Sequence, residues 1–300
     1  MLDRDLRKRK LTYVNKVIYS LIVFLSCELW FPVLVHAEEA LTLGLFPRRN
    51  AKVTIRMFKP LAEYLSVKTG RKIKITTAKN FPTFWKNVMQ GKYDIVHYNQ
   101  MHYIESNAKL GYQVIVQNEE FGAKEIRGAL VVRKDSGIYS VEDLKGKTIL
   151  FGGGQKAFVA YVVNAVLLHR AGLSRSDYIT KFAKNPPNAT IATYLKQADA
   201  GGIGDIGMEV PFLKQKGVDI SELKIIGLSE PFPQLPWAVN KSMNEDLKLL
   251  IQTVMLSLNG TTEGKSILQK AGMSRFNMAN DANYDSSRAI IAEYKSINIK

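Results

Sequence analysis

Short apolar runs and amphipathic helical segments alternate along almost all of residues 41–296. The apolar run at 41–45 leads through a loop into a helical segment with an apolar residue at every fourth position, which ends at Gly70. Further strands are predicted at 72–76, 93–96, 112–116, 129–133, 147–151, 224–228 and 237–240, with a short strand or turn at 204–207. Further helices are predicted at 81–90, 101–110, 156–170, 188–198, 247–258, 264–271 and 286–296. This order is typical of an α/β fold in which helices cover both faces of each sheet.

Two breaks rich in glycine or proline, at 122–128 and 231–236, divide this alternation unequally. We predict two lobes, each a mixed sheet flanked by helices. Residues 38–127 and 232–300 together form the first lobe, and 128–231 form the second. Two chain crossings between the lobes then act as a hinge around a cleft, and loops at the carboxyl ends of the strands are expected to line that cleft.

Residues 1–37 have the organisation of a secretory signal peptide. A basic leader precedes an apolar run at 17–35, and small residues at Val35 and Ala37 mark a cleavage site. A retained membrane anchor and a lipoprotein attached at Cys27 are the alternatives. We predict cleavage near Ala37 and a periplasmic location. Because Cys27 is the single cysteine, the mature chain then has no thiol for a disulfide, a metal site or a nucleophile.

The net charge of the whole chain is +15, and the leader carries only a small part of it. A basic surface raises the rate of encounter with anions and anionic surfaces. No nucleic-acid-binding motif or dense basic tract accompanies the charge, so we do not expect nucleic acid as a partner. The sequence also lacks a HExxH motif, a nucleophile elbow and a metal-ligand cluster. We therefore expect a monomeric binding protein for a small anion, with no catalytic residues, metal or cofactor.

The glycine-rich turn at 152–156 is the strongest candidate site. Glycines after a strand let the backbone approach a ligand, and free amides at the start of the following helix favour an oxyanion. The alternative is an ordinary strand-to-helix turn. We predict ligand contacts from Gly154, Gln155, Lys156 and Ala157, with the Lys156 ammonium either adding a donor or facing solvent.

Hydrogen-bonding side chains follow the predicted strand at 93–96. Tyr98 and Asn99 are the preferred ligand contacts, through a hydroxyl group and through an amide. His97 either joins them or is a structural histidine of the core.

Aromatic and cationic residues complete the candidate set. Phe46, Phe81 and Tyr161 either line the cleft or pack in the core. Arg48 and Arg49 follow the first strand, where one guanidinium either holds an oxyanion through two hydrogen bonds or remains solvated.

Several segments together carry a family resemblance: SVEDLKGK at 140–147, FKPLAEYLSVKTG at 58–70, GKYDIVHYNQ at 91–100, the glycine-rich turn at 151–158 and LPWAVN at 235–240. They resemble the phosphate/phosphite/phosphonate-binding (PhnD-like) branch of the type 2 periplasmic binding proteins, and the resemblance covers 41–295. It implies a protein that captures a phosphorus oxyanion for an ABC importer and works with its permease. A sensory protein of the same fold that presents the anion to a histidine kinase is the alternative.

The resemblance also concerns individual residues. The family brings an acid into the cleft at the positions of Asp205 and Glu209, where a carboxylate would accept a proton of the ligand or cap the short helix that follows. The family's loop offers serine and threonine hydroxyls where this chain has residues 155–158, and it often has tyrosine at the position of Phe81. These departures leave phosphate, phosphite and phosphonate open as ligands.

Overall fold

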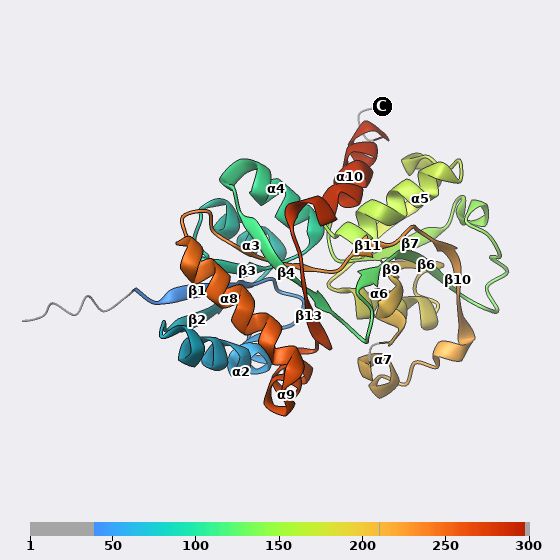
Figure 1. The fold of residues 1–300 in the computed structure, drawn as a ribbon. Coiled ribbons are helices and arrows are strands. Elements are labelled where there is room, and N and C mark those ends of the chain that lie inside the picture. Colours follow the sequence, from blue (N-terminus) through green and yellow to red (C-terminus); the bar gives the residue numbers. More distant parts are fainter. Residues whose placement is uncertain (1–38, 210, 298–300) are drawn as a thin grey trace, which may run out of the picture. The chain divides into compact units, whose positions relative to one another are not determined.

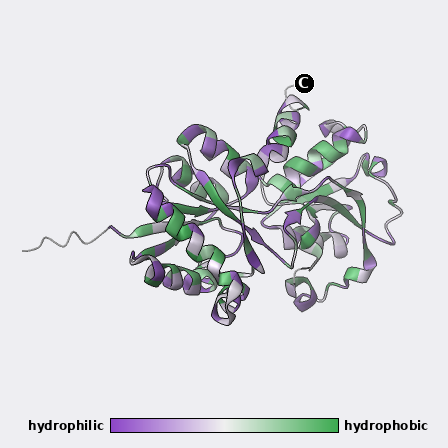
Figure 2. Cartoon of the chain, viewed as in Figure 1, coloured by the Kyte–Doolittle hydropathy of each residue, from purple (hydrophilic) through white to green (hydrophobic). Residues whose placement is uncertain are grey.

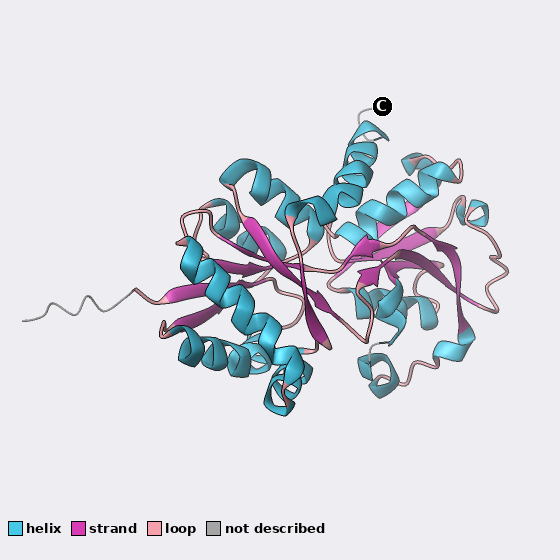
Figure 3. Cartoon of the chain, viewed as in Figure 1, coloured by secondary structure: helices cyan, strands magenta, loops and turns pink. Residues whose placement is uncertain are grey.

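The computed structural model describes residues 39–209 and 211–297, whose strands form two large sheets and one small one (Figure 1). The predicted leader, the cleavage point at Ala37 and Cys27 lie outside the described residues. Within the described part, no helix is both long and apolar enough to cross a membrane. Helices lie on both sides of the large sheets (Figure 3).

The first lobe contains a six-stranded sheet. In spatial order its strands are β13 (Arg275–Met278), β4 (Gln113–Glu119), β12 (Pro236–Val239), β3 (Ile95–His97), β1 (Leu41–Leu45) and β2 (Ile73–Thr77). β1 pairs in parallel with β2 and β3, whereas β12 and β13 join through antiparallel pairs. Leu45 lies beside both Thr77 and His97 in this register, so the loops that follow these three strands leave one edge of the sheet.

Two apolar layers attach helices to this sheet. One face is covered by α2 (Ala51–Thr69), α8 (Glu245–Ser257), which runs into η6 (Leu258–Gly260), and α9 (Thr262–Ala271). The other face is covered by α3 (Phe81–Met89) and α4 (Gln100–Leu110). In α2 the buried positions include Phe58, Leu61 and Leu65, while Met57 lies at the edge of the layer. Figure 2 shows the apolar residues gathered on the strands and on the inner sides of the helices.

The second lobe contains a five-stranded sheet. In spatial order its strands are β10 (Leu223–Leu228), β6 (Gly128–Arg133), β9 (Ala200–Gly204), β7 (Thr148–Gly152) and β8 (Ile179–Ala183). Its helical segments are η1 (Glu142–Leu144), η2 (Phe158–Val163), α5 (Asn164–Arg170), η3 (Arg175–Asp177), α6 (Pro186–Tyr194), η4 (Asp205–Glu209), α7 (Pro211–Gln215) and η5 (Ile220–Glu222). η2 is a single wide π-helical turn that continues into α5. Such turns are frequent at functional sites.

The sequence prediction missed three strands of the two large sheets: β8, β9 and β13. β9 has the sequence AGGIG, and glycine is ordinarily depleted in strands. Here small residues are required, because a Cβ added to Gly202 would lie 2.2 Å from the Phe151 ring and 2.8 Å from the carbonyl oxygen of Ala160. The close approach of neighbouring elements therefore selects glycine in a central strand.

The chain crosses between the lobes at both predicted breaks. β5 (Glu125–Ile126) and β11 (Phe232–Pro233) lie on these crossings and pair as a two-stranded antiparallel sheet. After β13 the chain passes through η7 (Asp281–Tyr284) into α10 (Asp285–Ile297), which contacts α4 of the first lobe and α5 and η2 of the second. Ile290 and Ile291 belong to the apolar cluster of the second lobe. The lobe boundaries at 127 and 231 remain a prediction, and α10 joins both lobes rather than the first alone.

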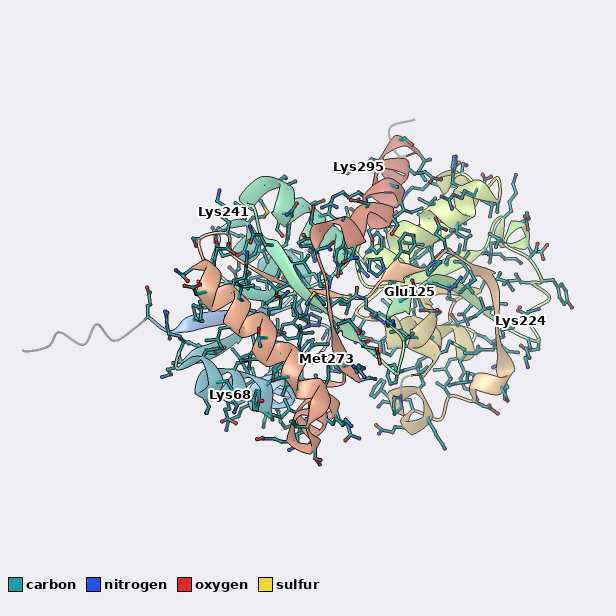
Figure 4. The ribbon with its side chains drawn as sticks, in the orientation of Figure 1. Lys68, Glu125, Lys224, Lys241, Met273 and Lys295 are labelled. Carbon is teal, nitrogen blue, oxygen red and sulfur yellow. The ribbon has the colours of Figure 1, made fainter. Side chains whose placement is uncertain are left out.

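The basic charge is spread over many elements. Lys68 at the end of α2, Lys241 before α8, Lys224 on β10 and Lys295 on α10 lie far apart on the described surface (Figure 4). This dispersal resembles a solvated surface more than one continuous binding patch.

Candidate ligand-binding site at the junction of the lobes

The glycine-rich turn after β7 offers three free backbone donors. Gly153 has a φ of +118°, which L side chains rarely adopt, and its amide donates to the Ala183 carbonyl at 3.0 Å. The amides of Gly154, Gln155 and Lys156 donate to no other group among the described residues. η2 begins just beyond them without a side-chain cap. Such a turn suits an oxyanion.

The neighbouring helix α6 adds no such donors. Its first two residues are Pro186 and Pro187, which have no amide hydrogen, and the Asn188 amide is already bonded to Asn185 at 3.1 Å. Among the described residues, the free donors on this side of the second lobe are therefore those of the turn at 154–156 and of the first turn of η2 that follows it.

Lys156 reaches from this turn to the first lobe. Its carbonyl accepts a hydrogen bond from Asn99 Nδ2 at 2.8 Å, and its Nζ lies 2.5 Å from Glu105 Oε2. The same Nζ lies 4.8 Å from the centre of the Trp85 ring. The sequence prediction allowed the ammonium to add a donor or to face solvent, whereas the structure pairs it with a carboxylate of α4.

Trp85 and Glu105 were missed as site residues. Trp85 belongs to α3 and Glu105 to α4, and neither follows a predicted strand directly. The only available signal was the one-turn spacing of His102 and Glu105, which places both on one side of α4. That spacing does not indicate Lys156 as the partner.

The residues after β3 divide between core and junction. His97 is buried, its ring is stacked 4.3 Å from that of Trp237, and its Nδ1 lies 3.3 Å from the Pro236 carbonyl oxygen. Tyr98 is completely buried and its hydroxyl is bonded to Ser106 at 2.8 Å. Since this hydroxyl lies within the first lobe's core, the structure does not support Tyr98 as a ligand contact. His97 takes the structural role.

Asn99 has two roles at the start of α4. Its Oδ1 accepts a hydrogen bond from the His102 amide at 2.9 Å, which caps the helix, and its Nδ2 makes the bond to Lys156. Asn99 therefore lies where the two lobes touch, beside the turn that carries the free amides.

The three candidate aromatic residues are mainly packing residues. Phe46 is buried and its ring meets the Phe81 ring edge-on, with 6.2 Å between the ring centres. Phe81 is half-buried. Tyr161 is completely buried between Phe151 and Phe182, and its hydroxyl has no hydrogen-bond partner among the described residues. Tyr161 thus belongs to the second lobe's core, and only Phe81 keeps a partly open surface.

The two arginines after β1 differ in their surroundings. Arg48 makes two hydrogen bonds to the buried Glu120, at 2.7 and 3.4 Å, so its charge is already neutralised. Arg49 has no hydrogen bond or ion pair within the described part of the chain. Its side chain reaches solvent, yet the surrounding protein and then the charge of Arg48 lower the pKa of its guanidinium. Arg49 is therefore the free cation of this loop.

The structure describes the side-chain contacts of Asp205 but not those of Glu209. Asp205 Oδ1 accepts hydrogen bonds from the Arg127 amide at 3.0 Å and from the Ile206 amide at 2.8 Å, so it fixes the chain beside the first crossing. Glu209 ends η4, and its side chain lies outside the described structure. A role for either carboxylate toward a ligand remains a prediction.

Lowering the pH from 7 to 5.5 is expected to reduce the free energy of unfolding by about 1 kcal/mol for each of His97 and His102. The pKa of each is lowered to about 3, mainly by burial and, for His102, also by the charge of Lys156. Between this value and the ordinary pKa of the unfolded chain, the unfolded state binds more protons, so stability rises with pH. Urea denaturation across this range measures the slope. The double variant His97→Gln/His102→Gln should give a flatter curve, and an equally steep one would contradict the assignment.

Two mixed α/β lobes, joined by paired crossings, define the class of two-lobed periplasmic binding proteins. A family model described as "ABC transporter, phosphonate, periplasmic substrate-binding protein" matches residues 43–284. The chain belongs to this family, which confirms the resemblance found in the sequence.

Solved structures share this fold. A binding protein component of an ABC phosphonate transporter from Pseudomonas aeruginosa has a TM-score of 0.75 and 19% identity, covering 87% of this chain and 88% of that chain. PhnD1 from Prochlorococcus marinus in complex with methylphosphonate has a TM-score of 0.74 and 17% identity, covering 85% and 98%. The aliphatic sulphonate binding protein SsuA from Escherichia coli has a TM-score of 0.61 and 16% identity, covering 87% of this chain and 93% of that chain. The predicted fold class is confirmed.

The family assignment also defines the general role. Its members are periplasmic substrate-binding proteins of transporters rather than enzymes, and such proteins bind small ligands and work with permease components.

Proposed function

We propose that this protein captures a phosphorus oxyanion (phosphate, phosphite or an alkylphosphonate) between its lobes and delivers it to the permease of an ABC importer. The observation that carries this proposal is the set of three free amides at Gly154, Gln155 and Lys156, directly before an uncapped helix start. Backbone amides at such a position bind oxyanions without a dedicated side chain. They replace the serine and threonine hydroxyls that the family resemblance led us to expect.

The first lobe supplies the charge in this proposal. Arg48 and Lys156 are neutralised by Glu120 and Glu105, whereas Arg49 is not paired among the described residues. An anion brought beside Arg49 would pair with its charge, and a guanidinium suits a tetrahedral oxyanion. Asn99 lies at the junction of the lobes, where it is bonded to Lys156.

Arg49→Gln is expected to weaken binding of the preferred phosphorus oxyanion about tenfold or more, because a charge-assisted hydrogen bond is replaced by a neutral one. Titration calorimetry of residues 38–300 against phosphate, phosphite, methylphosphonate and sulfate measures this directly. The matched control is Arg56→Gln, since Arg56 is an exposed arginine on nearby α2 with no hydrogen bond or ion pair in the described residues. Failure of the wild-type protein to bind any phosphorus oxyanion would refute the proposed function.

The proposal also includes the compartment and the oligomeric state. Export to the periplasm with removal of residues 1–37, and a monomeric state, are part of the same proposal. The matched family is one of transport proteins, so the sensor alternative is not carried further.

A further inference from the structure

The side chain of Lys156 occupies a cation site built by the opposite lobe. Its ammonium lies 2.5 Å from a carboxylate oxygen of Glu105 and 4.8 Å from the centre of the Trp85 ring. A carboxylate and the face of an aromatic ring, tryptophan above all, are both groups that proteins use to hold an organic ammonium. Glu105 comes from α4 and Trp85 from α3, so the site exists independently of the loop that fills it.

The surrounding residues hold this site in shape. The Trp85 ring is stacked on the ring of His102, with 4.8 Å between centres and 21° between planes. His102 is buried, and burial followed by the Lys156 charge lowers its pKa to about 3, so it is neutral at pH 7. The Glu105 side chain is only 15% exposed. The two charges at the site are therefore one carboxylate and one ammonium.

This cation site adjoins the proposed anion site. Lys156 contributes one of the three free amides, its carbonyl is bonded to Asn99, and its side chain ends at Glu105. The two sites are therefore no farther apart than the length of one lysine side chain, so the ammonium lies close to a phosphonate held by the turn.

We propose that Lys156 determines ligand specificity by filling the site of Glu105 and Trp85 with the protein's own ammonium. This inference rests on the proposed function and narrows its substrate class to phosphorus oxyanions that carry no positive group. An alkylphosphonate with an amino group would have to displace Lys156 or lie beside a like charge, and either is unfavourable. Removing the lysine side chain's charge opens the site to the amino group of such a ligand.

Calorimetry with methylphosphonate and 2-aminoethylphosphonate tests this inference. The wild-type protein is expected to prefer methylphosphonate by about tenfold or more, and Lys156→Met should reduce or invert this ratio by about tenfold. The ratio is the decisive quantity, because loss of a contact between the lobes would change both affinities together. Lys145→Met is the matched control: Lys145 is an exposed lysine of the second lobe paired with Asp177.

Two further variants complete the design. Lys156→Arg keeps the charge and should keep the preference, which also covers the case in which Lys156→Met folds poorly. Adding Glu105→Gln to Lys156→Met should abolish the gained affinity for 2-aminoethylphosphonate. Equal wild-type affinity for the two phosphonates, or an unchanged ratio in Lys156→Met, overturns this inference alone. Absence of binding by any phosphorus oxyanion overturns it together with the proposed function.

Discussion

Arg48→Met is expected to lower the free energy of unfolding by about 3–5 kcal/mol at pH 7, because it leaves a buried carboxylate without its partner. Glu120 is only 6% exposed and also accepts a hydrogen bond from Asn118 at 3.1 Å. Its two other side-chain hydrogen bonds come from Arg48, which is also the charge that stabilises it most. Urea denaturation monitored by circular dichroism measures the loss.

The pH dependence of this loss has a definite sign. Burial alone would raise the pKa of Glu120, but the charge and hydrogen bonds of Arg48 bring it below its ordinary value. In the wild-type protein this pair therefore stabilises the fold above the unfolded-state pKa, and the contribution is lost as the pH falls through the folded-state pKa. In Arg48→Met burial still raises the pKa of Glu120, and only the smaller contributions of His97 and Arg49 oppose it, so the penalty at pH 7 should shrink as the pH falls.

Two controls separate a buried pair from an ordinary one. Arg170 bonds Glu293 at 2.9 and 2.7 Å, but its side chain is 44% exposed, so Arg170→Met should cost only about 1 kcal/mol or less. The double variant Arg48→Met/Glu120→Gln should recover most of the loss, since no buried charge remains. If Arg48→Met lowers the free energy of unfolding no more than Arg170→Met does, the buried charge of Glu120 does not depend on Arg48 for its stability.

Gly152→Ala is expected to lower the free energy of unfolding by about 3 kcal/mol, at the upper end for overpacking. An added Cβ would lie 2.4 Å from the Cα and 3.0 Å from the backbone nitrogen of Pro186. These are backbone atoms at the start of α6, which cannot rotate away as the end of a side chain can. Either α6 or the turn that carries the free amides must move, so affinity for a phosphorus oxyanion should fall as well.

Gly154→Ala is the matched control for stability. A Cβ at Gly154 would have no atom within 4 Å, and Gly154 is not among the glycines with positive φ. We therefore expect a change within about 0.5 kcal/mol. The denaturation midpoints of the two variants, measured side by side, test this explanation. The midpoint of Gly152→Ala should be the lower one, and equal midpoints would contradict a steric clash with Pro186.

The candidate site was only partly predictable from the sequence. The glycine-rich turn and the polar residues after β3 were found because strand ends and glycine runs are local features. The sequence did not show that the Tyr98 hydroxyl is buried against Ser106, because Ile95–His97 are all buried and give no alternation from which to infer the side that the next residue takes. Lys156 was found, but Glu105 lies 51 residues away and no local pattern connects the two.

The sequence by itself determined the α/β order, the two crossings and the family. These depend on hydrophobic periodicity, glycine and proline positions and short motifs, all of which act over a few residues. The tertiary structure alone decided that β9 is a central strand, that α10 contacts both lobes, and that Arg48 and Lys156 are neutralised while Arg49 is not. These properties depend on which elements lie side by side. Burial and charge pairing are set by neighbours distant in the chain, so they emerge only when the sheets and helices have assembled.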